Sequence, residues 1–183
     1  MFPCALTTAY SSLNMRSFIT GATARWRGRY ENCTGLLKSK NNTMTITICG
    51  SMNFLGEMRK VKAELESFGH IVYIPEPEEA GSKDNGGDYW GRYKMSRSEV
   101  KKKYNYIKKH KDLIDIADAI LVINEDKNGI KHYVGANTFL EAGYAYYMNK
   151  KIYFKNPLPL QGYLTDELEA MDIVVLDGDF SKI

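Results

Sequence analysis

The sequence predicts an α/β fold of the Rossmann or flavodoxin-like kind, a three-layer sandwich built on a five-stranded parallel sheet. From Thr45 onward, short β-branched segments alternate with longer segments in which apolar residues recur every three or four positions. One of the short segments, residues 120–123, is apolar throughout, which is typical of a central strand covered on both faces of a parallel sheet. Strands and helices that alternate in this way favour right-handed connections, with helices on both sides of the sheet.

The elements are expected in alternating order, with a long loop between the second strand and the second helix. The strands are expected at residues 45–49, 70–74, 120–123, 151–154 and 173–176. The helices are expected at about residues 55–68, 96–117 and 135–149, with a short acidic helix that opens at Thr165. The lysines opposite the apolar stripe of the second helix are expected to form a solvated face. Residues 76–93 hold four glycines and are predicted to be a long loop, a kind of segment that often binds ligands.

The composition is that of one globular domain. The chain has 183 residues, of which 44% are hydrophobic and 26% charged, and these values exclude a globally disordered or collagen-like protein. The net charge of +3 is uneven, because residues 1–43 hold six Lys or Arg against one acid, whereas residues 44–183 hold 19 against 21. A near-neutral domain does not favour binding to a nucleic-acid polymer, so we expect no such partner.

Residues 1–43 form a basic leader without a helical or strand period, so the predicted domain spans residues 44–183. The leader is expected to be disordered, and its composition is alternatively that of an organellar transit peptide. Three cysteines do not make a disulfide framework, which favours a reducing compartment. We therefore expect a cytoplasmic protein, or an organellar one if the leader is a transit peptide. No segment is long and apolar enough to cross a bilayer, so we expect no membrane partner.

Ligands in open parallel sheets bind beyond the carboxyl ends of the strands. Gly50 and Ser51 follow the first predicted strand, where they form either a ligand-binding turn at a helix start or a tight turn with Ser51 as a helix cap. Cys49 is expected to be a buried thiol rather than a nucleophile. Asn124 ends the apolar strand and is placed to contact a ligand.

Glu141 is the most informative charged residue of the sequence. It is the only charged residue between Lys131 and Lys150, and Asn137 and Thr138 lie about one helical turn before it. A carboxylate in apolar surroundings is costly unless it is paired, and such groups are enriched at active sites. The structural alternative is a carboxylate that reaches solvent or pairs within the core.

Two other kinds of residue carry weaker signals. Asp118 directly precedes the apolar strand, and taken alone it is a turn residue that closes the preceding helix. The three histidines, His70, His110 and His132, show no metal-ligand spacing, so we expect no metal site and no cofactor.

Three segments resemble the nucleoside 2-deoxyribosyltransferase superfamily, which includes deoxynucleoside 5′-monophosphate N-glycosidases. They are residues 48–52 (Ile-Cys-Gly-Ser-Met), residues 117–124 (Ala-Asp-Ala-Ile-Leu-Val-Ile-Asn) and residues 135–145 (Gly-Ala-Asn-Thr-Phe-Leu-Glu-Ala-Gly-Tyr-Ala). The resemblance implies that Glu141 is a nucleophile that forms a covalent glycosyl-enzyme. It also implies that Asp118 helps to protonate the leaving base, in chemistry that parallels a retaining glycosidase.

The resemblance also implies a set of residues around the substrate. The substrate-binding residues would be Cys49, Gly50, Ser51, Asn124, Gly135, Asn137 and Thr138, with Tyr89 or Trp90 of the long loop stacking on the base. The sequence departs from the family in three places. It lacks the tyrosine of the first strand near Thr47 or Ile48, it has Gly135 where transferases carry an aspartate, and it has Met-Asn at residues 52–53 where the monophosphate hydrolases carry an arginine. The tyrosines available to replace the missing one are Tyr89, Tyr133 and Tyr144.

The sequence therefore predicts an N-glycosidase or N-glycosyltransferase that cleaves the base–sugar bond of a nucleoside or nucleotide through a covalent glycosyl-Glu141 intermediate. Its partner would be this small molecule, and the chain would form a homodimer or a higher homo-oligomer. The first alternative is a non-catalytic nucleotide-binding or signalling module on the same fold. The second is a structural or interaction protein in which Glu141 is a paired core residue.

Overall fold

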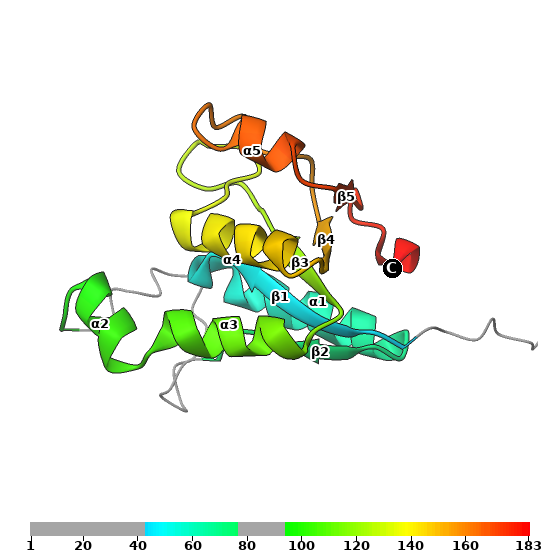
Figure 1. Cartoon of the computed structure of the whole chain (residues 1–183), viewed down its shortest axis with the longest axis horizontal. Helices are drawn as coiled ribbons and strands as arrows, with labels where there is room; N and C mark the ends of the chain where they lie inside the picture. The colour runs from blue at the N-terminus through cyan, green and yellow to red at the C-terminus, as the bar shows by residue number, and fades with distance from the viewer. Residues whose placement is uncertain (1–42, 77–93) are drawn as a thin grey trace, which may run out of the picture. The chain divides into compact units, whose positions relative to one another are not determined.

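The computed structural model describes residues 43–76 and 94–183 of the chain (Figure 1). The predicted leader, apart from Thr43, lies outside the described residues. So does most of the long loop, including the proposed stacking residues Tyr89 and Trp90. In the part that the structure describes, no helix has the length and apolar character needed to span a membrane.

The described residues form one parallel sheet. Its strands are β1 (Thr45–Gly50), β2 (Ile71–Tyr73), β3 (Ala119–Ile123), β4 (Lys151–Phe154) and β5 (Ile173–Val175). All adjacent pairs are parallel and the spatial order is β2-β1-β3-β4-β5, the order of a flavodoxin-like sheet. The predicted five-stranded α/β sandwich is confirmed.

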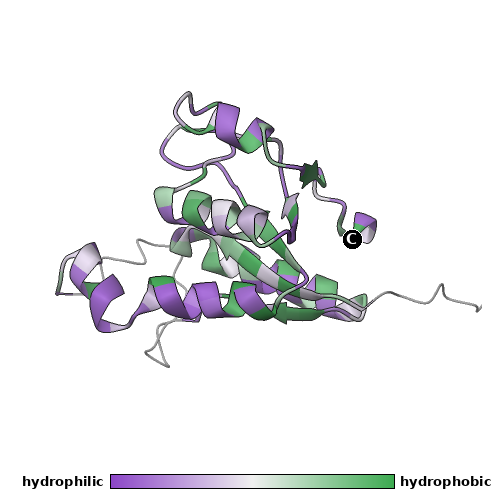
Figure 2. Ribbon diagram, in the orientation of Figure 1, coloured by the Kyte–Doolittle hydropathy of each residue, from purple (hydrophilic) through white to green (hydrophobic). Residues whose placement is uncertain are grey.

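Helices alternate with these strands along the chain, as predicted. They are α1 (Leu55–Ser67), α2 (Arg97–Lys103), α3 (Tyr106–Ile116), α4 (Ala136–Tyr147) and α5 (Thr165–Glu169), with the short 3-10 helices η2 (Met52–Phe54) and η4 (Phe180–Lys182). Most of β3 and β5 is hydrophobic, whereas α2 and α3 carry many hydrophilic residues (Figure 2).

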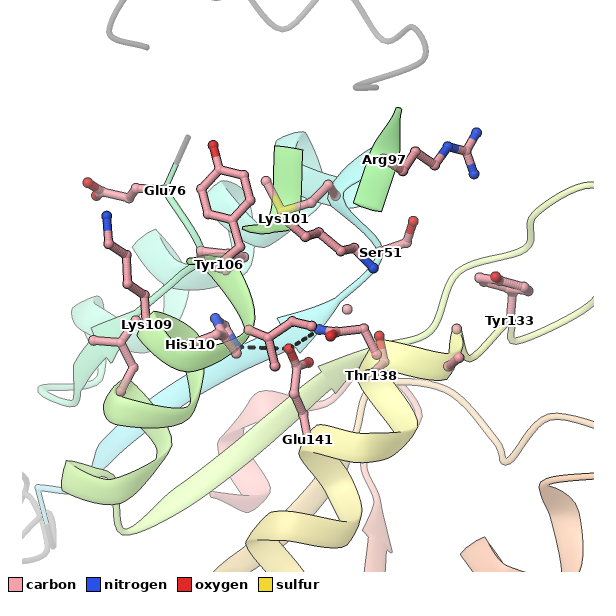
Figure 3. Close-up of a pocket in the computed structure, with 18 of the residues that line it drawn as sticks. Ser51, Glu76, Arg97, Lys101, Tyr106, Lys109, His110, Tyr133, Thr138 and Glu141 are labelled. Carbon is pink, nitrogen blue, oxygen red and sulfur yellow. Dashed lines mark hydrogen bonds and ion pairs between the residues drawn. The ribbon is translucent and has the colours of Figure 1, made fainter. Parts of the chain in front are cut away.

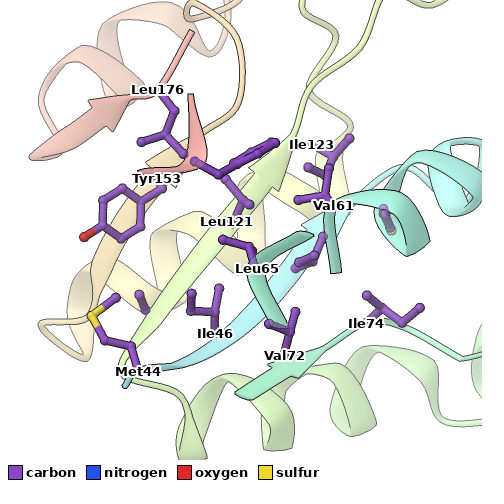
Figure 4. Packing of buried hydrophobic residues seen from close by; sticks show 14 of the residues in the cluster. Met44, Ile46, Val61, Leu65, Val72, Ile74, Leu121, Ile123, Tyr153 and Leu176 are labelled. Carbon is purple, nitrogen blue, oxygen red and sulfur yellow. The ribbon is translucent and has the colours of Figure 1, made fainter. Parts of the chain in front are cut away.

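The strands bury apolar side chains on both faces of the sheet. On one face, Ile46 of β1 and Leu121 of β3 pack in a cluster with Val61 and Leu65 of α1 (Figure 4). Successive strand residues point to opposite faces, which is why the neighbouring β-branched positions of β1 can serve both layers. Full burial of one such aliphatic side chain stabilises the fold by about 1.5–3 kcal/mol.

The opposite face is covered by α3 and α4. Val122 of β3 and Phe154 of β4 belong to a second cluster with Ile114 of α3 and Ala142 of α4. Both helices also contact β1. This arrangement brings the polar start of α4 and one side of α3 to the carboxyl end of β1, where the candidate site lies.

The predicted helix over residues 96–117 is wrong as a single element, because the structure divides it into α2 and α3. The break lies at Asn105, which has a left-handed backbone with φ of 54°. Asparagine tolerates this conformation better than most residues because its short polar side chain can bond to nearby backbone groups. The hydrophobic period continues across the break, so the sequence pattern does not reveal it.

Candidate active site

A pocket of about 250 Å³ lies at the carboxyl ends of β1 and β2 (Figure 3). In the sheet, β1 lies between β2, which follows it along the chain, and β3. The direction in which successive strands are added to the sheet therefore reverses between β1 and β3. In open α/β sheets this reversal opens a crevice in which ligands bind. The start of α4, one side of α3 and Lys101 of α2 complete the wall.

Glu141 of α4 lies in the wall of the pocket, with a side chain that is only 12% exposed. Its Oε1 accepts a hydrogen bond of 2.5 Å from Nδ2 of Asn137, one turn earlier on the same helix. The same Oε1 lies 3.8 Å from Nε2 of His110. Its second oxygen, Oε2, is buried and has no hydrogen-bond partner among the described residues. Burial raises the pKa of the Glu141 carboxyl to about 8, against the opposing effects of Cys49, Lys101 and Asn137.

His110 and Cys49 lie next to this carboxylate. Nε2 of His110 is 3.4 Å from Sγ of Cys49, and the thiol is fully buried behind the pocket wall. Burial lowers the pKa of His110 to about 4, so the imidazole is neutral at physiological pH. Burial, followed by the charge of Glu141, raises the pKa of the Cys49 thiol well above its usual value, so the thiol is protonated.

Sequence reasoning missed His110 as a site residue. It is 61 residues from Cys49 and comes from a different element than Glu141, so no local spacing connects the three. One signal was present, because His110 precedes Ile114 by one turn and so lies on the buried side of α3.

The rim of the pocket is basic. Arg97 and Lys101 of α2, Lys109 of α3 and Lys127 line it. Lys101 extends from α2 over the cavity toward Ser51 (Figure 3). The expectation of a solvated lysine face fails for Lys101, which is half-buried in the pocket wall, whereas Lys109 is exposed as expected although it also lines the rim. Against these cations, the acidic side chains among the described lining residues are those of Glu76 and Glu141.

The start of α4 and the side chain of Lys127 add positive potential at the rim. Gly135 is the N-cap of α4 and has no side chain to cap it, so the first N–H groups of the helix are available to a ligand. Ser51 accepts a hydrogen bond of 2.8 Å from Nζ of Lys127, and this ammonium also lies 4.9 Å from the centre of the Tyr133 ring. The pocket mouth is thus suited to an anion beside an aromatic surface.

The structure brings most of the predicted site residues together. Those that line the pocket are Gly50, Ser51, Gly135, Asn137, Thr138 and Glu141. Of the candidate tyrosines, Tyr133 lines the pocket, whereas Tyr144 donates a hydrogen bond to Asp115. Tyr89 lies outside the described residues.

Three predicted residues do not line the pocket, and the reasons are structural. Cys49 is fully buried behind the pocket wall. Asp118 precedes β3, so it lies at the amino edge of the sheet, opposite the pocket, where it is exposed and its Oδ2 accepts a hydrogen bond of 2.8 Å from the backbone of Thr45. Asn124 is fully buried and does not line the pocket. Its side-chain amide donates to the carbonyls of Asn156 and Pro157, at 3.1 and 2.8 Å, and so ties β3 to the segment after β4.

No protein-family model and no curated protein matches the chain. The solved structures that are similar to it include two 2-deoxyribosyltransferases. A 2-deoxyribosyltransferase from Bacillus psychrosaccharolyticus has 20% sequence identity and a TM-score of 0.44, over 67% of this chain and 80% of that one. A 2-deoxyribosyltransferase from Leishmania mexicana has 19% identity and a TM-score of 0.39, over 61% of this chain and 63% of that one. Both are enzymes of the class that the sequence motifs resemble.

The arrangement combines a nearly buried carboxylate, a neutral imidazole and a cationic rim. The carboxyl group, which is mostly protonated at neutral pH, can attack an electrophilic carbon once it has lost its proton, and the imidazole can accept a proton from water. The rim can bind an anionic part of the same molecule. Cys49, His110 and Glu141 also form, within the described residues, a group of potential metal ligands whose donor atoms lie within 4.8 Å of one another.

Proposed function

We propose that this chain is an N-glycosidase or N-glycosyltransferase that cleaves the base–sugar bond of a nucleoside or nucleotide, with Glu141 as the nucleophile. The observation that carries the proposal is the unpartnered Oε2 of Glu141 at the pocket wall. A buried carboxylate oxygen without a hydrogen bond is unfavourable, and it is retained where it has chemistry to perform. The motif resemblance supplies the reaction class.

In the first step, the carboxyl group of Glu141 loses its proton to solvent and Oε2 bonds to the anomeric carbon of the sugar. The bond between this carbon and the base nitrogen breaks, its electron pair goes to the base, and the base takes up a proton from water in the open pocket. The hydrogen bond from Asn137 to Oε1 holds the carboxylate in one orientation during the attack. The result is free base and a glycosyl ester on Glu141.

In the second step, water attacks the anomeric carbon and releases the carboxylate of Glu141. His110 would accept the proton of this water, because its imidazole is neutral and faces the same cavity. If a second base attacks instead of water, the product is a new nucleoside. Asp118 has no part in either step because it lies at the other edge of the sheet.

The assay for this proposal is a chromatographic measurement of free base. The full chain is incubated with ribo- and deoxyribonucleosides and their 5′-monophosphates, each with and without a second base. We expect free base from at least one substrate and, in a transferase, a new nucleoside when the second base is present. No base release across the whole panel would contradict the proposal.

We predict that phosphorylated substrates are preferred, because four cationic side chains line the rim. Lys101→Ala should raise KM for a 5′-monophosphate by about 10-fold or more, since a charge-assisted hydrogen bond contributes about 1.5–3 kcal/mol. The KM for the matching nucleoside should change little. Lys102→Ala is the matched control, because Lys102 is exposed on the same helix and does not line the pocket. Equal effects on nucleotide and nucleoside would contradict this role of Lys101.

A second candidate function is a non-catalytic nucleotide-binding module. The placement of Asp118 away from the pocket favours it, because the acid that the family resemblance implies is then missing from the site. So does Thr47 in β1, whose hydroxyl donates to the backbone of Leu113 where the family carries a tyrosine. The same assay separates the two functions: a binding module raises the melting temperature with nucleotide and releases no base.

We also propose that the chain is a homodimer or higher homo-oligomer through the outer side of α4. Leu140 and Tyr147 are 62% and 81% exposed, and their spacing of seven puts them on one side of the helix. We predict that light scattering after size exclusion gives at least twice the chain mass, and that Leu140→Glu lowers it to the monomer mass. Lys60→Glu on α1, on the other face of the sheet, should leave the mass unchanged. A monomeric unsubstituted chain would refute the interface.

A further inference from the structure

We propose that Cys49, His110 and Glu141 form a binding site for a divalent ion of the zinc class. The three residues come from β1, α3 and α4, and each offers a ligand atom of a type that binds zinc. The site is separate from the basic rim and lies where the pocket wall meets the core.

The separations of the donor atoms fit a single ion. Zinc binds sulfur at about 2.3 Å and nitrogen or oxygen at about 2.0–2.2 Å, so tetrahedral ligand atoms lie roughly 3.4–3.6 Å apart. Sγ of Cys49 is 3.4 Å from Nε2 of His110, and this nitrogen is 3.8 Å from Oε1 of Glu141. The third separation, between Sγ of Cys49 and the carboxyl group of Glu141, lies within 4.8 Å, so an ion would fit the first two ligands with shifts of a few tenths of an ångström and would draw the carboxyl group up to about 1 Å closer.

A second, independent observation points to a ligand at the same place. Oε2 of Glu141 is buried and has no hydrogen-bond partner among the described residues, although the carboxyl group lies against both other donors. The other oxygen is held by Asn137, whose hydrogen bond would orient the carboxylate as outer-shell partners of metal ligands do. A metal ion would provide Oε2 of Glu141 with the partner that it lacks among the described residues.

The donor set selects the class of ion. Thiolate and imidazole are ligands of zinc, cobalt and copper, whereas magnesium and calcium require oxygen ligands. On binding, the Cys49 thiol and the Glu141 carboxyl group would each lose a proton to solvent. One thiolate and one carboxylate would then neutralise the two charges of the ion, so the core would bury a neutral cluster. With three protein ligands, the fourth position would face the pocket.

Binding of the ion and cleavage of a base–sugar bond would exclude each other, because both use the carboxylate of Glu141. This consequence, inhibition of base release by zinc and its reversal by a chelator, rests on the proposed function. The metal site itself rests on the placement of the three side chains and on the buried Oε2 of Glu141, and not on the proposed function.

The test is metal binding by the full chain in which Cys4 and Cys33 are replaced by serine, so that Cys49 is the single thiol. Equilibrium dialysis against Zn²⁺ should give one ion per chain. Cys49→Ser and His110→Ala should each weaken binding by more than about 100-fold, since even the loss of an outer-shell partner costs 10–100-fold. His132→Ala is the matched control and should change affinity by less than about twofold.

Cobalt provides a readout that needs no substitution at the site. Co²⁺ bound by the Cys4→Ser/Cys33→Ser chain should give a near-ultraviolet charge-transfer band from the thiolate and intense visible bands from a four-coordinate ion. Absence of the thiolate band, or zinc binding that survives Cys49→Ser, would overturn the inference. Binding is measured without substrate, so zinc binding without base release refutes only the proposed function, and base release without zinc binding refutes only the metal site.

Discussion

Glu141→Ala abolishes base release, and Glu141→Gln lowers it by a factor of about 10³ or more, if this carboxylate is the nucleophile. The alanine variant removes the attacking oxygen, and the glutamine variant keeps the shape but replaces it with a weakly nucleophilic amide. In both, Asn137 and His110 stay in place, so the pocket still binds substrate. The measurement is initial rate of base release with the best substrate of the panel.

Two further measurements separate catalysis from structure. The melting temperature of Glu141→Gln should not fall at neutral pH, because the carboxyl group, with a pKa of about 8, is mostly uncharged there and the amide keeps its volume. Added azide or formate should restore part of the base release of Glu141→Ala, because a small anion can occupy the vacated space and attack the sugar. Full activity in either variant would exclude Glu141 as nucleophile.

Asp118→Asn is to be compared with Glu141→Ala, because Asp118 is the other residue to which the family resemblance assigns a catalytic role. The family resemblance assigns an acid role to this residue, but in the structure it is exposed and bonds to the start of β1. We therefore expect the variant to keep its rate within about threefold, with a loss of stability of about 1 kcal/mol from the altered hydrogen bond. A loss as large as that of Glu141→Ala would restore the role that the resemblance implies.

Gly50→Ala destabilises the chain by about 1–3 kcal/mol, as expected for a methyl group forced into a packed site. A Cβ at this position would lie 2.8 Å from the backbone oxygen of Ile123, where β1 and β3 reach the pocket side by side. Backbone cannot move aside as a flexible side chain can. The displaced turn would also carry Ser51 out of the pocket wall, so base release should fall by about 10-fold or more.

Gly143→Ala is the matched control for this substitution. Gly143 lies inside α4, and a Cβ there meets no atom within 4 Å. Alanine should stabilise the helix by about 0.5–1 kcal/mol, because glycine loses more conformational freedom on folding. Urea unfolding of both variants measures the difference, and equal free energies of unfolding would contradict the close approach of the two strands at Gly50.

The fold could be predicted because each element carries its own local signal. The strand at residues 151–154 was predicted with the bounds that the structure shows, because its apolar run is short and a proline follows soon after it. The apolar β3 segment indicated a central strand, and it lies third of five in the sheet. The break at Asn105 was not visible, because a left-handed residue changes the direction of a helix without changing its hydrophobic period.

The site was predictable only where its residues are neighbours in sequence. Asn137, Thr138 and Glu141 were found together because they share one side of α4. His110 was missed because its contact with Glu141 joins two helices that only the folded sheet brings together. Asp118 was assigned to the site, although the predicted fold already placed it elsewhere. A residue that precedes a parallel strand lies at the amino edge of the sheet, opposite the edge where ligands bind.

The left-handed residue at Asn105 makes α2 a separable specificity element. This helix has seven residues, its one buried side chain is that of Val100, and a capping box of Ser96 and Glu99 stabilises its first turn. Its cations contribute to the rim, whereas Glu141 and its hydrogen-bond partner are held by α4. Exchange of residues 97–103, with Val100 kept, would therefore change the cations at the rim of the pocket while leaving the contacts of Glu141 within α4 unchanged.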